Sequence, residues 1–579
     1  MSLRELYIPW FTVIFLVLSG ALLASESLLK YLPKGKDEEQ SKERGTNLLE
    51  RILPQGDREV VFFLLLMALS VTLRVWRFGS IPGGMNQDGA MAAVDAKALA
   101  DYGTDRFGTF LPVHFKAWGY GQMSVLMSYC MVPFIKLFGL NAVTARLPIL
   151  LSSLGGLVAL YFICRRLLGV RGAQIALFFA ACNPWHFMQS RWALDCNMFP
   201  HVFLLGLCFL LKGVKGKRRF LWLSMVFYAL CMYSYGIAFY TVPVFLLIMS
   251  LYYLWKGMLK LWEVAVAALV YLAISWPIYL TMMINAFGWK TIRTFFCTMP
   301  YFSGSVRSGD ILFFSSDKGA QFLKNLTALK QVYLEGDGLP WNTVPGYGVI
   351  TKCFLPFVLL GVITCIKSLV KETDPFKKAG FVALISYFLV ANLSGLITAQ
   401  VNVNRINILH YSLLIFGGMG IDFSIRQFKL SAWIIWPAYL IISALFLREY
   451  FTVHAASLEW YYFHDYVEAV SFAGEQENVE RYVITQYVRG EYVQSTSEIL
   501  TMFAMELDAE FFQGKRLDEN GLSYKEKITY ADASQCQTDD TKAVAYVMRK
   551  RDAGVKAWDH YKLYPFGDYY VAVPEEAVK

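Results

Sequence analysis

A polar stretch at 81–122 follows the apolar run 60–75 and carries the first side chains that could do chemistry. Asp88 stands at the start of an Ala-rich segment, 89–100, which predicts a short helix. The Pro-Gly-Gly sequence at 82–84 predicts a break after the preceding helix. A carboxylate placed there can accept a proton from a hydroxyl group, or it can cap the helix by accepting backbone N–H groups. The sequence leaves both roles open.

The same stretch ends in a basic and aromatic set: His114, Lys116, Trp118 and Tyr120. The two basic side chains can hold an anion, so both are candidate substrate-binding residues. A lone histidine is often only part of a core, and His114 keeps that alternative.

A second charged segment contains Arg191 and Asp195, four residues apart between two apolar runs. On a helix this spacing can give an ordinary salt bridge. A charged pair near hydrocarbon is costly unless it serves a cavity or a partner. Both residues are therefore also candidates for substrate binding.

Two further polar loops supply the remaining candidates. Arg405 lies in the hairpin 400–407 between two apolar runs, where its guanidinium fork can hold a phosphate or extend toward lipid headgroups. Asp337 and Asn342 end the loop 285–348, in a Gly- and Pro-containing turn, and can either bind a substrate or cap a turn.

The composition decides the class of protein. Of the 579 residues, 56% are hydrophobic and only 17% are charged, which indicates a polytopic helical membrane protein. The net charge of +9 fits basic cytoplasmic loops and anionic membrane lipids, so it calls for no nucleic acid. Twelve apolar runs predict membrane spans: 7–25, 60–75, 147–164, 173–190, 199–211, 220–235, 237–255, 262–284, 349–366, 380–397, 408–424 and 431–447.

Lysine and arginine in the short loops predict the orientation of these spans. The basic loops, predicted to face the cytoplasm, are 26–59, 165–171, 212–219, 256–260, 367–378 and 426–429. Alternation of the spans places the other loops outside: 76–146, 191–198, 285–348, 398–407 and 448–579. The apolar segment 121–140 would upset this alternation as a span, and it contains Pro133 and Lys136. We therefore expect it to be a re-entrant or juxtamembrane helix.

The chain divides into three parts on this basis. We expect an N-terminal span and cytoplasmic loop at 1–59, a membrane domain at 60–447, and a soluble extracytoplasmic α/β domain at 448–579. Strand-like runs at 482–488, 543–548 and 569–573 and a helical run at 495–507 support the last of these. Such a domain could form its own core and influence the choice of acceptor.

Several functional classes find no support in the motifs. The chain has no P-loop, no G-x-G-x-x-G before a helix, no H-E-x-x-H, no G-x-S-x-G and no Cys/His metal spacing. Nucleotide binding and zinc chemistry are therefore disfavoured. A transporter or lipid flippase would be expected to show inverted repeats or charged, broken spans, which are not visible. A non-catalytic cell-envelope scaffold remains an alternative.

The order of motifs resembles the lipid-carrier-dependent glycosyltransferases of the GT-C fold, in particular the protein O-mannosyltransferase and aminoarabinose-transferase branch. The motifs, all loose, cover roughly 60–425 in this order: Pro82–Asp88, Arg146-Leu147-Pro148, Arg165-Arg166-Leu167-Leu168-Gly169, Asn183-Pro184-Trp185-His186, Ser190-Arg191 to Asp195, Gly336-Asp337 with Trp341-Asn342, and Arg405. The resemblance implies an all-α polytopic membrane enzyme with about twelve spans and juxtamembrane helices, followed here by the α/β domain. It implies a polyprenyl-phosphate-linked sugar as donor and a lipid, glycan or protein as acceptor, both at the outer face of the membrane.

The resemblance also assigns roles to residues. Family members commonly carry an Asp-Glu pair in the first outer loop, and its Asp is the catalytic base. Here the Asp matches Asp88, but Gly89 stands at the Glu position, so the second acid of the family has no counterpart. Arg405 is expected to hold the phosphate. The second-line substrate-binding candidates are Asp195, Arg191, His114, Lys116, Asp337 and Asn342. No cofactor is certain, and a divalent metal ion is left open.

Overall fold

The structure is a computed structural model that describes residues 55–117, 121–303, 312, 315–398, 400–477, 479–532, 543–555 and 558–575. The predicted span 7–25, most of the predicted loop 26–59, Trp118 and Tyr120 lie outside the described residues.

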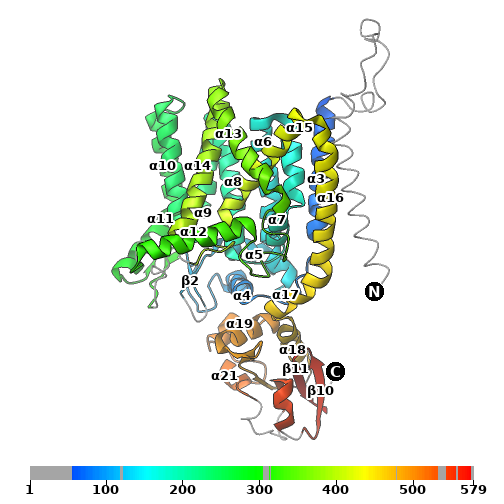
Figure 1. Ribbon diagram of the computed structural model, residues 1–579. Coiled ribbons are helices and arrows are strands. Elements are labelled where there is room, and N and C mark those ends of the chain that lie inside the picture. The colour runs from blue at the N-terminus through cyan, green and yellow to red at the C-terminus, as the bar shows by residue number, and fades with distance from the viewer. Residues whose placement is uncertain are drawn as a thin grey trace.

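Long apolar helices running side by side form the larger part of the molecule (Figure 1). Eight helices of the described part are long and apolar enough to cross a membrane, which makes the chain a multi-pass membrane protein. The helices of the bundle are α3 (Gln55–Val75), α6 (Ala142–Ala181), α8 (Asp195–Val214), α9 (Arg218–Cys231), α10 (Ala238–Trp255), α11 (Leu261–Phe287), α13 (Leu355–Lys371), α14 (Pro375–Ile397), α15 (His410–Gln427) and α16 (Ala432–Glu449). The predicted fold class, an all-α polytopic membrane protein, is confirmed.

Four of the twelve predicted spans are not among the eight as separate helices. Span 7–25 lies outside the described residues, and span 60–75 lies in α3, which carries Arg58, Glu59 and Arg74. Two predicted spans, 147–164 and 173–190, share α6, which is interrupted at Gly169 where φ is 81°. The second of them continues into the short helix α7 (Pro184–Gln189). Helix α9 has only 14 residues, and fewer than about 17 apolar residues rarely span a bilayer.

Three of the basic loops predicted to be cytoplasmic, 165–171, 367–378 and 426–429, meet at one end of the bundle. Arg171 and Arg426 both pair with Asp422, at 3.4 and 2.7 Å between nitrogen and carboxylate oxygen. Arg166 donates to the carbonyl of Phe376 at 3.4 Å. These three loops are far apart in the sequence and lie on the same side of the bundle, and the side of the membrane that they face stays a prediction.

The opposite end of the bundle carries short elements (Figure 1). Helix α12 (Lys318–Leu334) runs across the long helices, and α4 (Gln87–Tyr102) and α5 (Leu126–Phe138) lie near the C-terminal domain. At 13 residues, α5 is too short to span, as expected of a juxtamembrane helix in 121–140. Short antiparallel pairs complete this end: β1 (Phe115–Lys116) with β2 (Gln122–Met123), and β3 (Ile292–Arg293) with β4 (Thr298–Met299).

Two buried arginines fix the chain between α3 and α4. A helix end leaves carbonyl groups without intrahelical partners, and here guanidinium groups satisfy them. Arg191 donates to five backbone carbonyls, those of Leu73, Arg74, Trp76, Arg77 and Ile81. Arg146 donates to the carbonyls of Phe78, Gly79 and Gly84. The segment that leads to Asp88 is thus held at both of its ends.

The last bundle helix continues into the C-terminal domain through η6 (Tyr450–His454) and α17 (Ala455–Tyr461). A five-stranded sheet follows, in the order β10-β11-β9-β5-β8, with β5 parallel to both β8 and β9. Its strands are β5 (Arg481–Ile484), β8 (Ile528–Tyr530), β9 (Val544–Arg549), β10 (Tyr561–Phe566) and β11 (Tyr569–Pro574). The remaining elements are α18 (His464–Gly474), the hairpin β6 (Tyr487–Val488) and β7 (Glu491–Tyr492), α19 (Gln494–Ala504), α20 (Ala509–Phe512), α21 (Tyr524–Lys527) and η8 (Lys550–Val555). The expected α/β character is confirmed.

This domain packs directly on the polar stretch that contains Asp88. The amide of Met85 donates to the carbonyl of Tyr462 at 2.7 Å, and the Thr496 hydroxyl donates to Gln87 at 2.8 Å. Farther along α4, the Tyr102 hydroxyl donates to Asp508 at 2.5 Å. The domain has its own sheet, but it also supports α4.

Candidate active site

Asp88 lies in the first turn of α4, one residue inside the helix rather than at its cap. Asn86 is the N-cap residue. In the amide orientation that satisfies both groups, its oxygen accepts from the Gly89 N–H at 3.1 Å and its nitrogen donates to the Ala193 carbonyl at 3.3 Å. Asn86, and not Asp88, therefore caps α4.

Gly89 has a packing role that the sequence did not reveal. A Cβ atom at this position would lie 2.8 Å from the Ala193 carbonyl oxygen and 2.6 Å from the Asn86 side-chain amide. Real Cβ atoms essentially never come within 3.0 Å of other atoms, and a backbone carbonyl cannot move aside cheaply. The start of α4 thus lies too close to the segment before α8 for the glutamate of the family pattern.

Asp88 and Asp195 are close enough to interact electrostatically. Asp195 is the first residue of α8, and its Oδ1 accepts from the amide of Cys196 at 2.7 Å. Arg191 and Asp195 do not lie on one helix, because α7 ends at Gln189 and α8 begins at Asp195. Within the described chain, Arg191 and Asp195 form no ion pair. Two carboxylates from the starts of two helices therefore face one site.

Asn407 connects this site to the hairpin that carries Arg405. Its Nδ2 donates to the Cys196 carbonyl at 3.2 Å and to Oδ1 of Asn197 at 3.0 Å. Its Oδ1 accepts from Nε1 of Trp185 at 2.6 Å. Asn407 is buried, so these bonds fix the hairpin against the start of α8. Sequence analysis missed this residue, although its Asn-rich hairpin was the available signal.

Asp337 orders the same hairpin from the other side. Its Oδ2 accepts from the Val403 amide at 2.9 Å and from Asn342 Nδ2 at 2.7 Å, and its Oδ1 accepts from the Leu339 amide at 3.0 Å. Burial raises the pKa of the Asp337 carboxyl, and these donors oppose that rise.

Asn342 extends this connection, because its Oδ1 accepts from Nε2 of Gln189 at 3.1 Å. Asp337 and Asn342 were predicted to bind substrate. Their hydrogen bonds give them a positioning role between the 400–407 hairpin and α7.

Arg405 lies half-buried in this hairpin. Its amide donates to Oδ1 of Asn402 at 2.9 Å, and its guanidinium is near Gln400 Oε1 at 3.5 Å and Tyr240. The structure thus brings Asp88, Asp195 and Arg405 into one region through Asn407, although the three are far apart in the sequence.

Arg191 has a different role from the predicted one. It is fully buried, and its two terminal nitrogens donate to the five carbonyls named above. This arrangement leaves its guanidinium no room for a substrate, and Arg191 instead holds the end of α3.

Within the described chain, neither His114 nor Lys116 forms a hydrogen bond or ion pair with Asp88 or Asp195. Burial lowers the pKa of His114 to about 4, so the imidazole is neutral at pH 7 and cannot serve as a cation for phosphate. Lys116 is exposed, with its Nζ 5.3 Å from the centre of the Phe107 ring.

An ion pair inside the polar stretch was not predicted. Asp95 and Arg106 have fully buried side chains and pair through the guanidinium, and Arg106 also donates to the Lys116 carbonyl at 2.8 Å. Asp95 is an isolated acid within an Ala-rich helix, which is the sequence signal that could have indicated a buried partner.

The described residues contain no group of three or more metal-binding side chains. Two neighbouring carboxylates such as Asp88 and Asp195 fit a Mg²⁺-like ion only when substrate phosphate oxygens and water complete its coordination.

Comparison with known proteins identifies the fold. Residues 123–281 match the family model of dolichyl-phosphate-mannose-protein mannosyltransferases. ArnT from Cupriavidus metallidurans in the apo state superposes with a TM-score of 0.52 at 13% identity, covering 89% of this chain and 98% of that chain. The chain has the GT-C fold of membrane glycosyltransferases. The expected resemblance and the enzyme class, a glycosyltransferase, are thereby confirmed.

Two other solved structures and the curated proteins were also compared with the chain. The structure of ArnT bound to undecaprenyl phosphate gives the same TM-score of 0.52 and the same 13% identity, over 89% of this chain and 98% of that chain. The apo oligosaccharyltransferase of Archaeoglobus fulgidus gives 0.46 at 12% identity, over 76% of this chain and 64% of that chain. Among curated proteins, none matches the chain. Within the GT-C fold, the matched segment 123–281 includes Asp195 and excludes Asp88 and Arg405.

Proposed function

We propose that this protein transfers a sugar from a polyprenyl-phosphate carrier to an acceptor hydroxyl at the outer face of the membrane. Asp88 is the general base and Arg405 holds the phosphate. The observation that carries the proposal is the convergence of Asp88, Asp195 and the Arg405 hairpin at one end of a GT-C bundle. A carrier-bound donor is also consistent with the similar structure of ArnT bound to undecaprenyl phosphate.

The geometry suits one displacement step. The acceptor oxygen attacks C1 of the sugar, the bond between C1 and the phosphate oxygen breaks, and the acceptor proton passes to the Asp88 carboxylate. Asp195 favours this transfer, because protonation of one of two neighbouring carboxylates relieves their repulsion. The departing phosphate takes the electron pair of the broken bond and gains a second negative charge, which a guanidinium fork stabilises.

Gly89 does not point to a degenerate scaffold. A missing family acid could signal loss of activity, but the close approach of Ala193 explains glycine at this position. The chain therefore departs from the family pattern for a packing reason.

The test compares two variants in two assays on the same purified protein. Asp88→Asn removes the proton acceptor, so sugar transfer from a polyprenyl-phosphate sugar should fall by roughly 10²–10⁴-fold while donor binding persists. Arg405→Ala removes a charge-assisted contact, so donor affinity should weaken by about ten- to a hundredfold. Arg405→Lys should recover only part of the lost affinity, because an ammonium group lacks the fork.

Asp101→Asn is the matched control for Asp88. Asp101 lies in the last turn of the same helix, where it forms a surface ion pair with Lys97 at 2.6 Å. Such pairs contribute little to stability, and this variant should keep full activity. Full transfer activity in Asp88→Asn would overturn the assignment of the base.

A further inference from the structure

A short aromatic hairpin follows α11 at the end of the bundle that carries α4. Its strands are β3 and β4, and the turn between them presents Phe295 and Phe296. Phe295 is 91% exposed, and Phe296 is exposed as well. The residues that lead into the hairpin add further exposed apolar surface, namely Phe287, Trp289 and Ile292. A cluster of this kind marks an interaction surface.

The hairpin packs on the exposed apolar face of α11. That face carries Leu269, Leu272 and Met283, which are exposed and share one side of the helix with Trp276. Because α11 is long and apolar enough to cross a membrane, such a stripe faces lipid acyl chains. The ring centres of Phe296 and Trp276 lie 6.0 Å apart. The hairpin therefore continues the lipid-facing surface of α11.

The hairpin also folds back along α11, away from the end of that helix. The chain returns beside the last turn, where Nδ2 of Asn285 donates to the Pro300 carbonyl at 2.9 Å. Trp276 precedes Phe287, the last residue of α11, by a length of helix of about 16 Å.

This distance sets the depth of the hairpin relative to the membrane. The 27 residues of α11 extend about 40 Å, and a hydrocarbon core is about 30 Å thick. At most about 10 Å of the helix can therefore project from the hydrocarbon at this end. Because Trp276 lies farther than this from the end of α11, the Phe296 ring beside it lies at the level of the acyl chains.

The backbone of the hairpin is paired, as a segment with little access to water requires. The Thr294 amide and hydroxyl both donate to the Cys297 carbonyl at 2.8 Å, and the Cys297 amide donates to the Thr294 hydroxyl at 3.0 Å. The Thr298 amide donates to the Leu111 carbonyl at 3.1 Å, and the Val113 amide donates to the Thr298 carbonyl at 3.0 Å. These last bonds join the hairpin to the polar stretch before β1.

The composition of this segment suits a lipid surface. Between 286 and 303 the chain has two basic residues, Lys290 and Arg293, and no acid. Trp289 and Lys290 lie at the base of the hairpin, and these residue types are common where a protein meets lipid headgroups. The basic side chains are also compatible with anionic headgroups.

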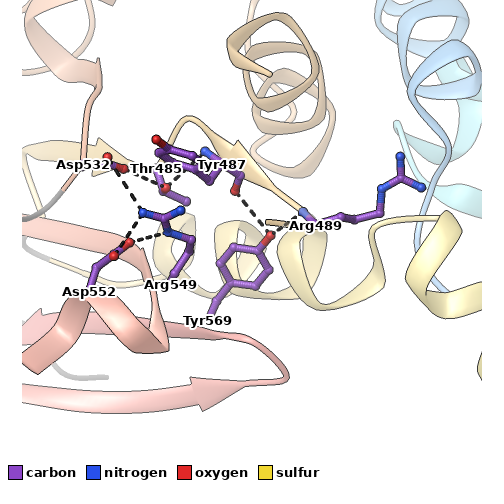
Figure 2. Close-up of polar contacts among 7 residues, drawn as sticks. All are labelled: Thr485, Tyr487, Arg489, Asp532, Arg549, Asp552 and Tyr569. Carbon is purple, nitrogen blue, oxygen red and sulfur yellow. Dashed lines mark hydrogen bonds and ion pairs between the residues drawn. The ribbon is translucent and has the colours of Figure 1, made fainter. Parts of the chain in front are cut away.

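The β6–β7 hairpin of the C-terminal domain provides a contrast (Figure 2). Its turn contains Arg489 and Gly490 in place of two phenylalanines. The Tyr569 hydroxyl accepts from the Arg489 amide at 3.2 Å and donates to the Tyr487 carbonyl at 3.4 Å, so this hairpin is held by its own domain. That domain lies beyond the end of the bundle (Figure 1).

We propose that the β3–β4 hairpin inserts Phe295 and Phe296 into the acyl chains of the membrane leaflet at the α4 end of the bundle. The partner is a lipid surface, and part of the predicted outer loop 285–348 lies in the membrane. Transfer of the two rings from water to lipid stabilises this position. The membrane contact is independent of sugar transfer, so failure of either proposal leaves the other standing.

Spin labels on the full chain in lipid bilayers test the depth of the hairpin. The parent is a chain whose exposed Cys353 and whose Cys536 are replaced by serine, and it also gives the background labelling. Collisions with oxygen, which concentrates in hydrocarbon, and with a water-soluble nickel chelate measure the depth of each label. The label on Phe295→Cys should lie about 5–10 Å below the headgroup phosphates. Because Phe295 is almost wholly exposed, this substitution should not disturb folding.

Two further positions complete the experiment. Lys290→Cys marks the base of the hairpin, and its label should lie at the level of the headgroups. Tyr492→Cys is the matched control, because Tyr492 is an exposed aromatic residue of the β6–β7 hairpin, and its label should lie in water. A label at 295 that lies no deeper than the label at 290, or that meets the nickel chelate as often as the label at 492, would overturn the proposal.

Discussion

At the scale of single residues, burial decides which candidates can act on a substrate. Asp88 and Arg405 are both half-buried, so part of each residue is exposed to solvent. Arg191 is fully buried, and its guanidinium stabilises the end of α3 by donating to backbone carbonyls. His114 is likewise enclosed, with only 5% of its surface exposed.

The burial of His114 has a measurable consequence for pH dependence. Its pKa is lowered to about 4 in the folded chain, whereas an unfolded histidine titrates near about 6.5. The unfolded state therefore binds more protons between these values, and stability is lost as the pH falls from 6.5 toward 4. At pH 5 the loss should be about 2 kcal/mol.

Thermal unfolding of the purified protein in detergent checks this expectation. His114→Gln should show a smaller fall in melting temperature between pH 7 and pH 5 than the natural chain. Equal falls in both proteins would show that His114 titrates normally.

At the scale of secondary-structure elements, the site depends on how closely the starts of α4 and α8 approach. Gly89→Ala places a Cβ atom 2.8 Å from the Ala193 carbonyl oxygen, so one of the two segments must shift. Overpacking of this kind typically costs about 1–3 kcal/mol of folding free energy. Denaturation of the purified variant measures the loss, and transfer activity should fall because Asp88 moves.

Gly236→Ala is the control for this prediction, because no atom lies within 4 Å of a Cβ at that position. It should leave stability and activity nearly unchanged. Gly89→Glu should behave like Gly89→Ala rather than gain activity from the added acid.

The 400–407 hairpin offers a second test at this scale. Asp337→Ala leaves the Val403 amide without its acceptor, so the hairpin should loosen and Arg405 should lose its fixed position. Donor affinity should then weaken by about tenfold, although Asp337 itself is occupied by backbone and amide donors.

Asp317→Ala is the matched control, since Asp317 caps α12 by accepting from the Ala320 amide at 2.9 Å. Lipid-binding assays on the two variants should differ. If Asp337→Ala bound the donor as tightly as the natural chain, the positioning role would be wrong.

At the scale of the whole molecule, the bundle separates two chemically different ends. One end holds the basic loops around Asp422, and the other holds α4, the Arg405 hairpin and the C-terminal domain. Because positive loops favour the cytoplasmic side, we expect the site and the C-terminal domain to face outside.

Cysteine labelling of intact cells with an impermeant reagent checks this orientation. In a chain whose exposed Cys353 and whose Cys536 are replaced by serine, Glu519→Cys should be labelled from outside. Lys215→Cys should be labelled only after the membrane is opened. Labelling of both positions in intact cells would contradict the topology.

The sequence alone determined the class of the protein and most of its elements. Apolar runs of sufficient length must be helices in a bilayer, because every backbone polar group needs a partner there. Alternating runs likewise predicted the strands near 482–488, 543–548 and 569–573, where β5, β6, β9 and β11 form. The order of the motifs was enough to suggest the GT-C resemblance and to select Asp88 as the candidate base and Arg405 as the candidate phosphate-binding residue.

Only the tertiary structure decided what each polar side chain does. Arg191 and Arg405 are the same residue type in similar loops, yet one faces the carbonyls at the end of α3 and the other lies in an accessible hairpin. The roles of Gly89 and Asn407 depend on Ala193 and on Cys196 with Trp185, which are distant in the sequence. Hydrogen bonds and steric contacts act over a few ångströms, so they are set by which segments meet, and a single sequence does not state which segments those are.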